Sequence, residues 1–96
     1  MNATATIVDK QNHLMVSGEL NFDTVVALWK QSLPFFEQRS AITINLSQVT
    51  TSNSAGLALL LEWMKYGNRH HKTVSFTEIP QQLRSIAAVA GVDWVA

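Results

Sequence analysis

The chain has no cysteine, little charge and no long apolar run. Without cysteine it forms no disulfide and has no thiolate to serve as a metal ligand or a nucleophile. Only 15% of its 96 residues are charged, while 47% are hydrophobic, against about a quarter charged in an average domain. Apolar runs such as residues 57–61 are far shorter than the roughly 20 residues that cross a bilayer. The composition therefore predicts a small soluble domain that keeps some apolar surface for a partner.

Charge of one sign is also lacking, because seven basic residues balance seven acidic ones. A nucleic-acid binder needs a basic stripe to release phosphate counterions, so this balance argues against that class. Residues 1–7 lack the basic residues and apolar run of a secretory signal. We expect one intracellular domain, residues 1–96, built around a single core.

The first third of the chain predicts a hairpin followed by a helix. Residues 4–8 and 14–17 are short β-prone runs separated by a polar turn, and Gly18 is expected to end the second strand. Asn21 or Asp23 is expected to cap the helix that follows. Pro34 predicts a kink or an end near Leu33, because proline removes a backbone hydrogen bond. Six apolar residues of this helix recur at spacings of three and four, which places them on one stripe: Phe22, Val25, Val26, Trp29, Leu33 and Phe36.

The middle of the chain predicts a strand, a polar turn and a Leu-rich helix. Residues 41–46 alternate like a half-buried strand, residues 47–53 are small or polar, and a helix is expected over 54–66 with residues 67–68 as its stop. The cluster of Ser, Thr and Asn before the helix offers several caps, Thr51, Ser52 and Asn53.

That helix carries two apolar stripes. One is suited to the core: Leu57, Leu60, Leu61 and Met64. The second stripe consists of Ala55, Leu59, Trp63 and Tyr66. Either it packs inside the fold, so that the helix is buried on two sides, or it faces a partner. Its aromatic members are expected at the edge of the core.

The last third predicts a strand over residues 73–77 and a helix that has Pro80 in its first turn and ends at Gly91. The helix face expected to pack inward consists of Leu83, Ile86, Ala87 and Ala90. Residues 92–95 are expected to dock or to form a short strand. The order β-β-α-β-α-β-α indicates an α/β fold: a mixed, largely parallel sheet of about four strands with three helices mainly on one face.

Metal and catalytic sites are not predicted. His70 and His71 are adjacent in the basic turn 69–72, where their side chains would diverge, and no acid has ligand spacing to them. Glu19 and Asp23 are accounted for by the dipole of the following helix, and no phosphate-binding Gly-X4-Gly-Lys-Ser/Thr loop occurs. We therefore expect neither a cofactor nor enzyme activity.

Motif and element order together resemble the STAS domain family, whose signature is a strand ending in Leu-Ser, then Asp-Ser-X-Gly and a Leu-rich helix. Here the signature reads Leu46-Ser47 and residues 53–57, Asn-Ser-Ala-Gly-Leu. Within the family, the chain is most similar to the small STAS subunits of ABC transporters that move phospholipid between the membranes of Gram-negative bacteria. The likeness lies in residues 17–20 with Asp23 and residues 28–29 downstream, in residues 46–49 and in residues 56–61. The resemblance covers nearly the whole chain.

The resemblance implies a non-enzymatic binding module in the cytoplasm, held at the inner membrane through its complex. In the transporter subunits the turn and its neighbouring helices contact the ATPase subunit and support its assembly and activity. The alternative is an anti-sigma factor antagonist, in which the serine at the place of Ser54 is phosphorylated by a partner kinase. Asn53 replaces the usual Asp; it caps a helix equally well, but a kinase that reads the carboxylate would not find it here.

The predicted partner-binding residues are Trp29, Ser52, Asn53, Ser54, Ala55 and Leu59. Trp29 fits both a core position and an interface anchor, and Ser54 fits both an ordinary helix start and a contact residue. The permease of the transporter would be reached only indirectly, and the apolar surface permits weak self-association.

Overall fold

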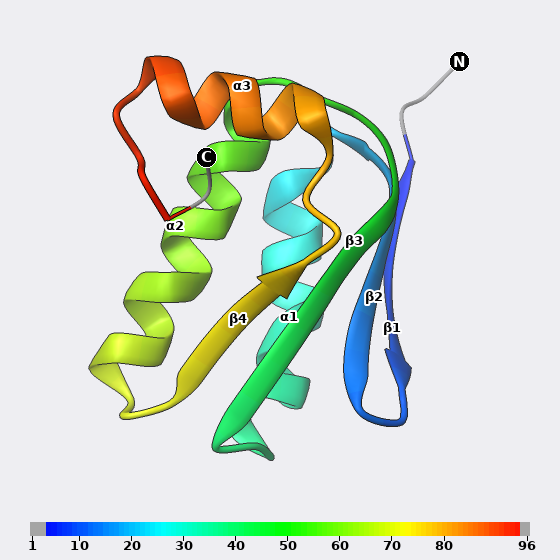
Figure 1. The fold of residues 1–96 in the computed structure, drawn as a ribbon. Coiled ribbons are helices and arrows are strands. Elements are labelled where there is room, and N and C mark those ends of the chain that lie inside the picture. The colour runs from blue at the N-terminus through cyan, green and yellow to red at the C-terminus, as the bar shows by residue number, and fades with distance from the viewer. Residues whose placement is uncertain (1–3, 95–96) are drawn as a thin grey trace.

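The computed structural model describes residues 4–94 and contains one four-stranded sheet with three helices (Figure 1). The elements are, in order, β1 (Ala5–Lys10), β2 (His13–Leu20), α1 (Val25–Glu37), β3 (Ala41–Ser52), α2 (Ser54–Arg69), β4 (Thr73–Thr77) and α3 (Gln81–Val89). The strand order is β1-β2-β3-β4, with β1 antiparallel to β2 and the other pairs parallel. The predicted element order and mixed sheet are confirmed. No helix in the described part of the chain is long and apolar enough to span a membrane.

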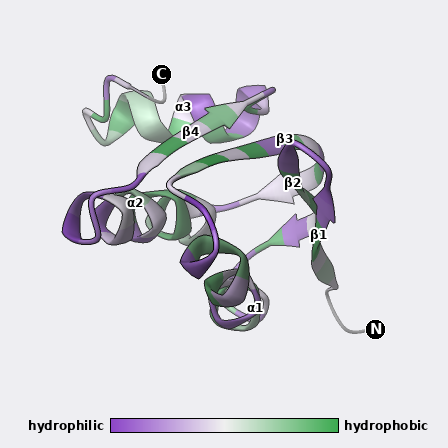
Figure 2. Cartoon of the chain, turned by 90° about the horizontal axis from the view of Figure 1, so that it is seen from below, coloured by the Kyte–Doolittle hydropathy of each residue, from purple (hydrophilic) through white to green (hydrophobic). Residues whose placement is uncertain are grey.

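Two helices cover one face of the sheet. α1 and α2 lie side by side on the same side of the strands, and α3 lies across the end of the sheet against α2 and β3 (Figures 1 and 2). Ile42, Ile44 and Leu46 of β3 are buried beneath them, whereas Thr43 and Asn45 point to the other, more open face. This is the alternation predicted for residues 41–46.

The start and end of α1 differ from the prediction. The N-cap is Thr24, without a side-chain cap bond, while Asn21 Oδ1 accepts the Asp23 N–H at 2.9 Å in the preceding turn. Pro34 lies inside the helix, which continues to Glu37. Of the two predicted alternatives, a kink or an end near Leu33, the end is therefore wrong. Phe36 lies beyond the proline and is fully buried, and its packing offsets the backbone bond that Pro34 removes.

The face of α1 that packs inward is also displaced from the predicted stripe. The buried residues are Leu28, Ser32 and Phe36. Phe22 is 74% exposed and Val26 is 59% exposed, so this end of the predicted stripe lies outside the core. The predicted residues do share one side of the helix, but this stripe is wider than the part of α1 that the sheet covers.

The strand β3 is twice as long as predicted. It runs to Ser52, because β2 itself continues past Gly18 to Leu20, and the two strands pair at Gly18↔Val49 and Leu20↔Ser52. The predictions that Gly18 ends a strand and that residues 47–53 form a turn are therefore wrong. Gly18 instead adopts φ +98° at a register shift, where a Cβ would overlap the Thr4 carbonyl oxygen.

The helix α2 begins at Ser54 as predicted and ends at Arg69, three residues later than predicted. Gly67 does not stop it; a Cβ at this position would come within 2.7 Å of Val74 Cγ2, so this glycine permits close packing on β4. Both apolar stripes contribute to the core, and Trp63, expected at its edge, is completely buried. α2 is thus buried on two sides.

The last part of the chain follows the prediction closely. β4 has the expected bounds, Pro80 is the N-cap of α3, and Gly91 follows the helix with φ +76°. On the predicted inner face Leu83 and Ala87 are buried, Ile86 is partly buried and Ala90 is exposed. Trp94 stacks on Phe76 with ring centroids 5.8 Å apart. Residues 92–94 form no strand, and the remainder of the predicted 92–95 segment lies outside the described residues.

Candidate partner-binding site

The start of α2 is fixed to the sheet by Asn53. Its side-chain Oδ1 accepts the Ala55 N–H at 2.8 Å, its carbonyl accepts the Gly56 N–H at 3.0 Å, and its own N–H donates to the Leu20 carbonyl at 3.1 Å. Asn53 is therefore the cap, as predicted, whereas Thr51 and Ser52 belong to β3. The cap joins the first turn of α2 to the end of β2 and so determines where the helix begins.

Gly56 allows this turn to lie directly on the strands. A Cβ at Gly56 would overlap Ser52 Oγ and would lie 3.1 Å from Leu20 Cβ. Ser52 is itself buried; its hydroxyl donates to the Asn53 carbonyl at 3.1 Å and its N–H donates to Gln82 Oε1 of α3 at 3.0 Å. Glycine at position 56 thus permits the close packing of α2 on the strands. The buried Ser52 lies under the corner where β3 ends and α2 begins, and its hydrogen bonds help to hold that corner in place.

Ser54 is the first residue of α2, and it is exposed. Within residues 4–94 its hydroxyl makes no hydrogen bond. It therefore projects into solvent at the positive end of the helix dipole. A group at this position can meet a partner without disturbing the fold.

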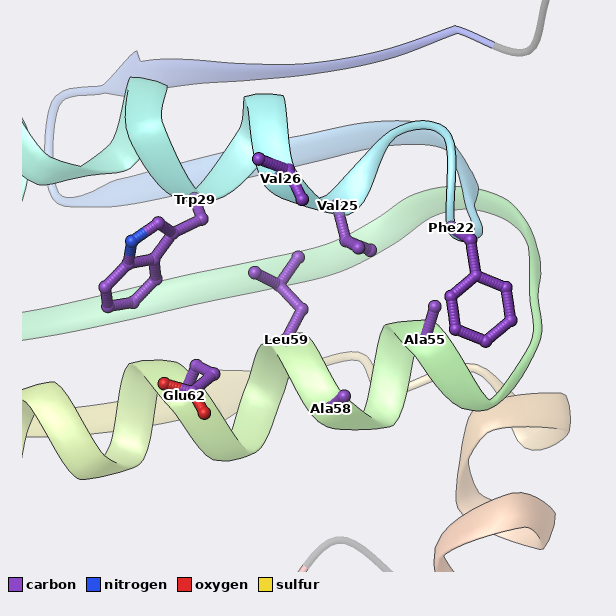
Figure 3. Close-up of a pocket in the computed structure, with 8 residues that line it drawn as sticks. All are labelled: Phe22, Val25, Val26, Trp29, Ala55, Ala58, Leu59 and Glu62. Carbon is purple, nitrogen blue, oxygen red and sulfur yellow. The ribbon is translucent and has the colours of Figure 1, made fainter.

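An apolar groove of about 320 Å³ runs between α1 and α2, beginning at this corner (Figure 3). Its lining consists of Phe22, Val25, Val26, Trp29, Ala55, Ala58, Leu59 and Glu62. Apart from the Glu62 carboxylate and the Trp29 indole N–H, these side chains carry no polar atom. In Figure 3, Leu59 points up between the helices, while Phe22 and Glu62 lie toward opposite ends.

Three of the six predicted binding residues meet in this groove, namely Trp29, Ala55 and Leu59. Asn53 and Ser54 are exposed immediately before Ala55, and Ser52 is buried below them. Trp29 is partly exposed, and its ring makes an edge-to-face contact with Tyr66 at 5.9 Å.

The other five lining residues were missed. Phe22, Val25 and Val26 were placed on one helical stripe but not on a binding surface, because a groove wall and a core stripe share the same helical spacing.

One acidic side chain, Asp23, is exposed beside Phe22 at one end of the groove. Glu19 alternates with the buried Leu20 and so points to the other face of the sheet, where its Oε1 accepts a hydrogen bond from Thr51 Oγ1 at 3.4 Å. Neither acid forms an ion pair with another described residue. At the other end Glu62 pairs with Lys65 at 3.4 Å, an exposed contact that contributes little.

The remaining polar clusters do not form a site. His70 stacks on Tyr66 with centroids 4.2 Å apart. Within residues 4–94 no group of three or more His, Asp or Glu side chains is placed to hold a metal ion. Arg39 and Asp9 form an ion pair of 2.5 Å at the end of the molecule away from the groove.

Comparisons with known proteins show the family and the fold of this chain. The family described as "Mlab, STAS domain" matches residues 3–95. The intermembrane phospholipid transport system binding protein MlaB of Haemophilus influenzae (strain ATCC 51907 / DSM 11121 / KW20 / Rd) is 31% identical over 88 residues, which cover 86% of this chain and 84% of that protein.

Two solved structures share the fold. The anti-sigma factor antagonist SpoIIAA in its unphosphorylated form superposes with a TM-score of 0.71 at 18% identity, covering 95% of this chain and 84% of that one. An anti-sigma factor antagonist from Mycobacterium paratuberculosis gives a TM-score of 0.70 at 23% identity, covering 96% of this chain and 80% of that one. Because the family match spans nearly the whole sequence and the MlaB relative is similar over most of both chains, this chain belongs to the STAS domain family.

Proposed function

We propose that the chain is a non-enzymatic subunit of an intermembrane phospholipid-transport ABC complex and that it docks on the ATPase of that complex, an MlaF-like subunit. The similarity to MlaB supports the assignment to this transport system. In this role the protein works in the cytoplasm, next to the inner membrane, and reaches the membrane permease only through the ATPase. Docking supports the assembly and activity of the ATPase.

The observation that carries the proposal is the apolar groove beside an exposed helix start. Phe22 and Val26 are mostly exposed at its rim, and Leu59 lies between the two helices. Large apolar side chains gathered on one surface are typical of interaction sites, because covering them removes apolar area from water.

The proposed docking surface combines this groove with the polar corner next to it. We define it by Phe22, Val26, Trp29, Ala55 and Leu59, together with Asn53 and Ser54. The exposed Phe22 and Val26 and the partly exposed Trp29 supply affinity by burial, whereas Ala55 and Leu59 are already 2% and 3% exposed and form the base of the groove. The Ser54 hydroxyl faces the partner. Ser52 acts indirectly, by holding the corner on the strand end.

Co-purification tests the proposal. The tagged chain is expected to co-purify with the ATPase encoded alongside it, and Ser54→Glu is expected to abolish this by placing a charge against the partner. Ser85→Glu, on the exposed side of α3, is the matched control and should bind like the wild type. Failure of the wild-type chain to bind the ATPase would overturn the function, and full binding by Ser54→Glu would overturn the corner as the contact.

The exposure of Ser54 also favours a second candidate, an anti-sigma factor antagonist regulated by phosphorylation of Ser54. A phosphate there would add about two negative charges, which the N-terminal end of α2 would stabilise, so the switch would act on a partner and leave the fold intact. Mass spectrometry of the protein from cells with and without the candidate kinase tests this. A kinase-dependent phosphoserine at position 54 supports it, and an unmodified serine under all conditions contradicts it.

A further inference from the structure

We infer that the groove between α1 and α2 receives an amphipathic helix of the ATPase, about two turns long, that runs antiparallel to both helices and carries basic residues in its last turn beside Asp23. The inference rests on the proposed function, which supplies the partner. It adds the conformation, orientation and charge of the segment that binds.

The chemistry of the lining favours a helix over an extended segment. Six of the eight lining side chains have no polar atom, and the walls are helices whose own backbone groups are bonded internally. An extended peptide in the groove would leave its N–H and C=O groups without partners over an apolar surface, at a cost for each. A helix satisfies its own backbone and presents only side chains.

The dimensions of the groove set the length of the segment. Along α2 the lining runs from Ala55 to Glu62, which at 1.5 Å per residue is about 10 Å, or two helical turns. Ala58 is small and exposed on this wall, so a partner helix can approach closely there. Its apolar anchors would recur at the i, i+3 or i+4, and i+7 spacing of groove-bound helices.

The charges determine the orientation. α1 and α2 both begin at the Phe22 end of the groove (Figure 3), so their positive dipole ends lie together. The carbonyl end of an incoming helix is favoured at that place. Asp23 is exposed there without an ion pair to any described residue, and Lys or Arg side chains are characteristic of the last turn of a helix. An antiparallel helix with a basic last turn satisfies both conditions.

The segment and its direction can be read by photo-cross-linking in the complex with the ATPase. We would place p-benzoylphenylalanine at position 22 or at position 62, at opposite ends of the groove, and at position 89 on the exposed side of α3 as a control. Both groove positions are expected to cross-link to one ATPase segment, with position 22 reaching its basic C-terminal turn and position 62 its N-terminal turn. Position 89 should give no cross-link to this segment.

The outcomes separate this inference from the proposed function. If the wild-type complex does not form, the proposed function fails. If the complex forms but the cross-links reach an acidic or extended segment, reverse their order, or reach only a second copy of this chain, the inference alone is overturned.

A charge reversal tests the placement of the basic residues independently. Asp23→Lys should weaken ATPase binding about fivefold at low salt, and the difference should shrink at high salt as the charges are screened. Asp93→Lys, exposed near the C-terminal end of the described chain, should bind like the wild type. Unchanged binding by Asp23→Lys at low salt would contradict the proposed orientation.

Discussion

The indole N–H of Trp63 donates a hydrogen bond of 2.8 Å to the hydroxyl oxygen of Ser32 in the buried contact between α2 and α1. The same hydroxyl donates to the Trp29 carbonyl at 2.6 Å, and Trp63 stacks on Phe36 with centroids 6.2 Å apart. The two helices are therefore held together by a polar contact inside the core. Since Trp29 is also a wall of the groove, this contact sets how far apart the groove walls stand.

Ser32→Ala should destabilise the fold, because it leaves the buried Trp63 N–H without an acceptor. An unsatisfied buried donor costs about 1–3 kcal/mol, and urea unfolding followed by tryptophan fluorescence measures the loss. Ser40→Ala, at an exposed position, is the control and should leave the unfolding midpoint unchanged. Equal midpoints for the two variants would show that the Trp63 bond contributes nothing.

Gly56→Ala should also destabilise, although alanine in a helix ordinarily stabilises by roughly 0.5–1 kcal/mol relative to glycine. The added Cβ would overlap Ser52 Oγ and crowd Leu20, and overpacking of this kind costs about 1–3 kcal/mol. Combining it with Ser52→Gly removes the overlapping hydroxyl and should recover part of the loss. A stabilised single variant would mean that the start of α2 does not lie on the strands as described.

The cap of α2 can be tested with two replacements at one position. Asn53→Ala removes the acceptor for the Ala55 N–H and should cost about 0.5–2 kcal/mol. Asn53→Asp keeps that acceptor and adds a negative charge at the helix N-terminus, so it should be at least as stable as the wild type. Thermal unfolding by circular dichroism compares the three proteins, and equal loss in both variants would argue against the cap.

The sequence predicted the fold where local patterns act alone. Asn53 as cap and the bounds of β4 depend on propensities of adjacent residues, and both are confirmed. Pro80 marks the start of α3 but is its N-cap and not part of its first turn. The length of β3 depends on its pairing with β2 beyond Gly18. Because Ser and Thr occur in strands and in turns, the residues of this segment alone do not show whether it continues the strand or forms a turn. The pairing with the partner strand decides this.

The candidate site was predicted only in part, for a related reason. Trp29, Ala55 and Leu59 were placed on a binding surface, and they do line one groove. Phe22 and Val26 were placed on a helical stripe but not on the binding surface, since apolar spacing shows which residues share a helix face but does not show how much of that face the sheet covers. A groove between two helices is lined by residues of both, so the apolar spacing along one helix alone cannot indicate it.

Binding of the ATPase in the groove between α1 and α2 can be measured by isothermal titration calorimetry with the purified ATPase and three forms of the chain. Val26→Asp puts a charge on the groove rim, and Val89→Asp puts the same charge on α3, at a position that is 92% exposed. If the ATPase occupies the groove, Val26→Asp weakens binding about tenfold or more while Val89→Asp binds like the wild type. Wild-type affinity of Val26→Asp together with weakened binding by Val89→Asp would contradict a groove interface and would place the interface on α3.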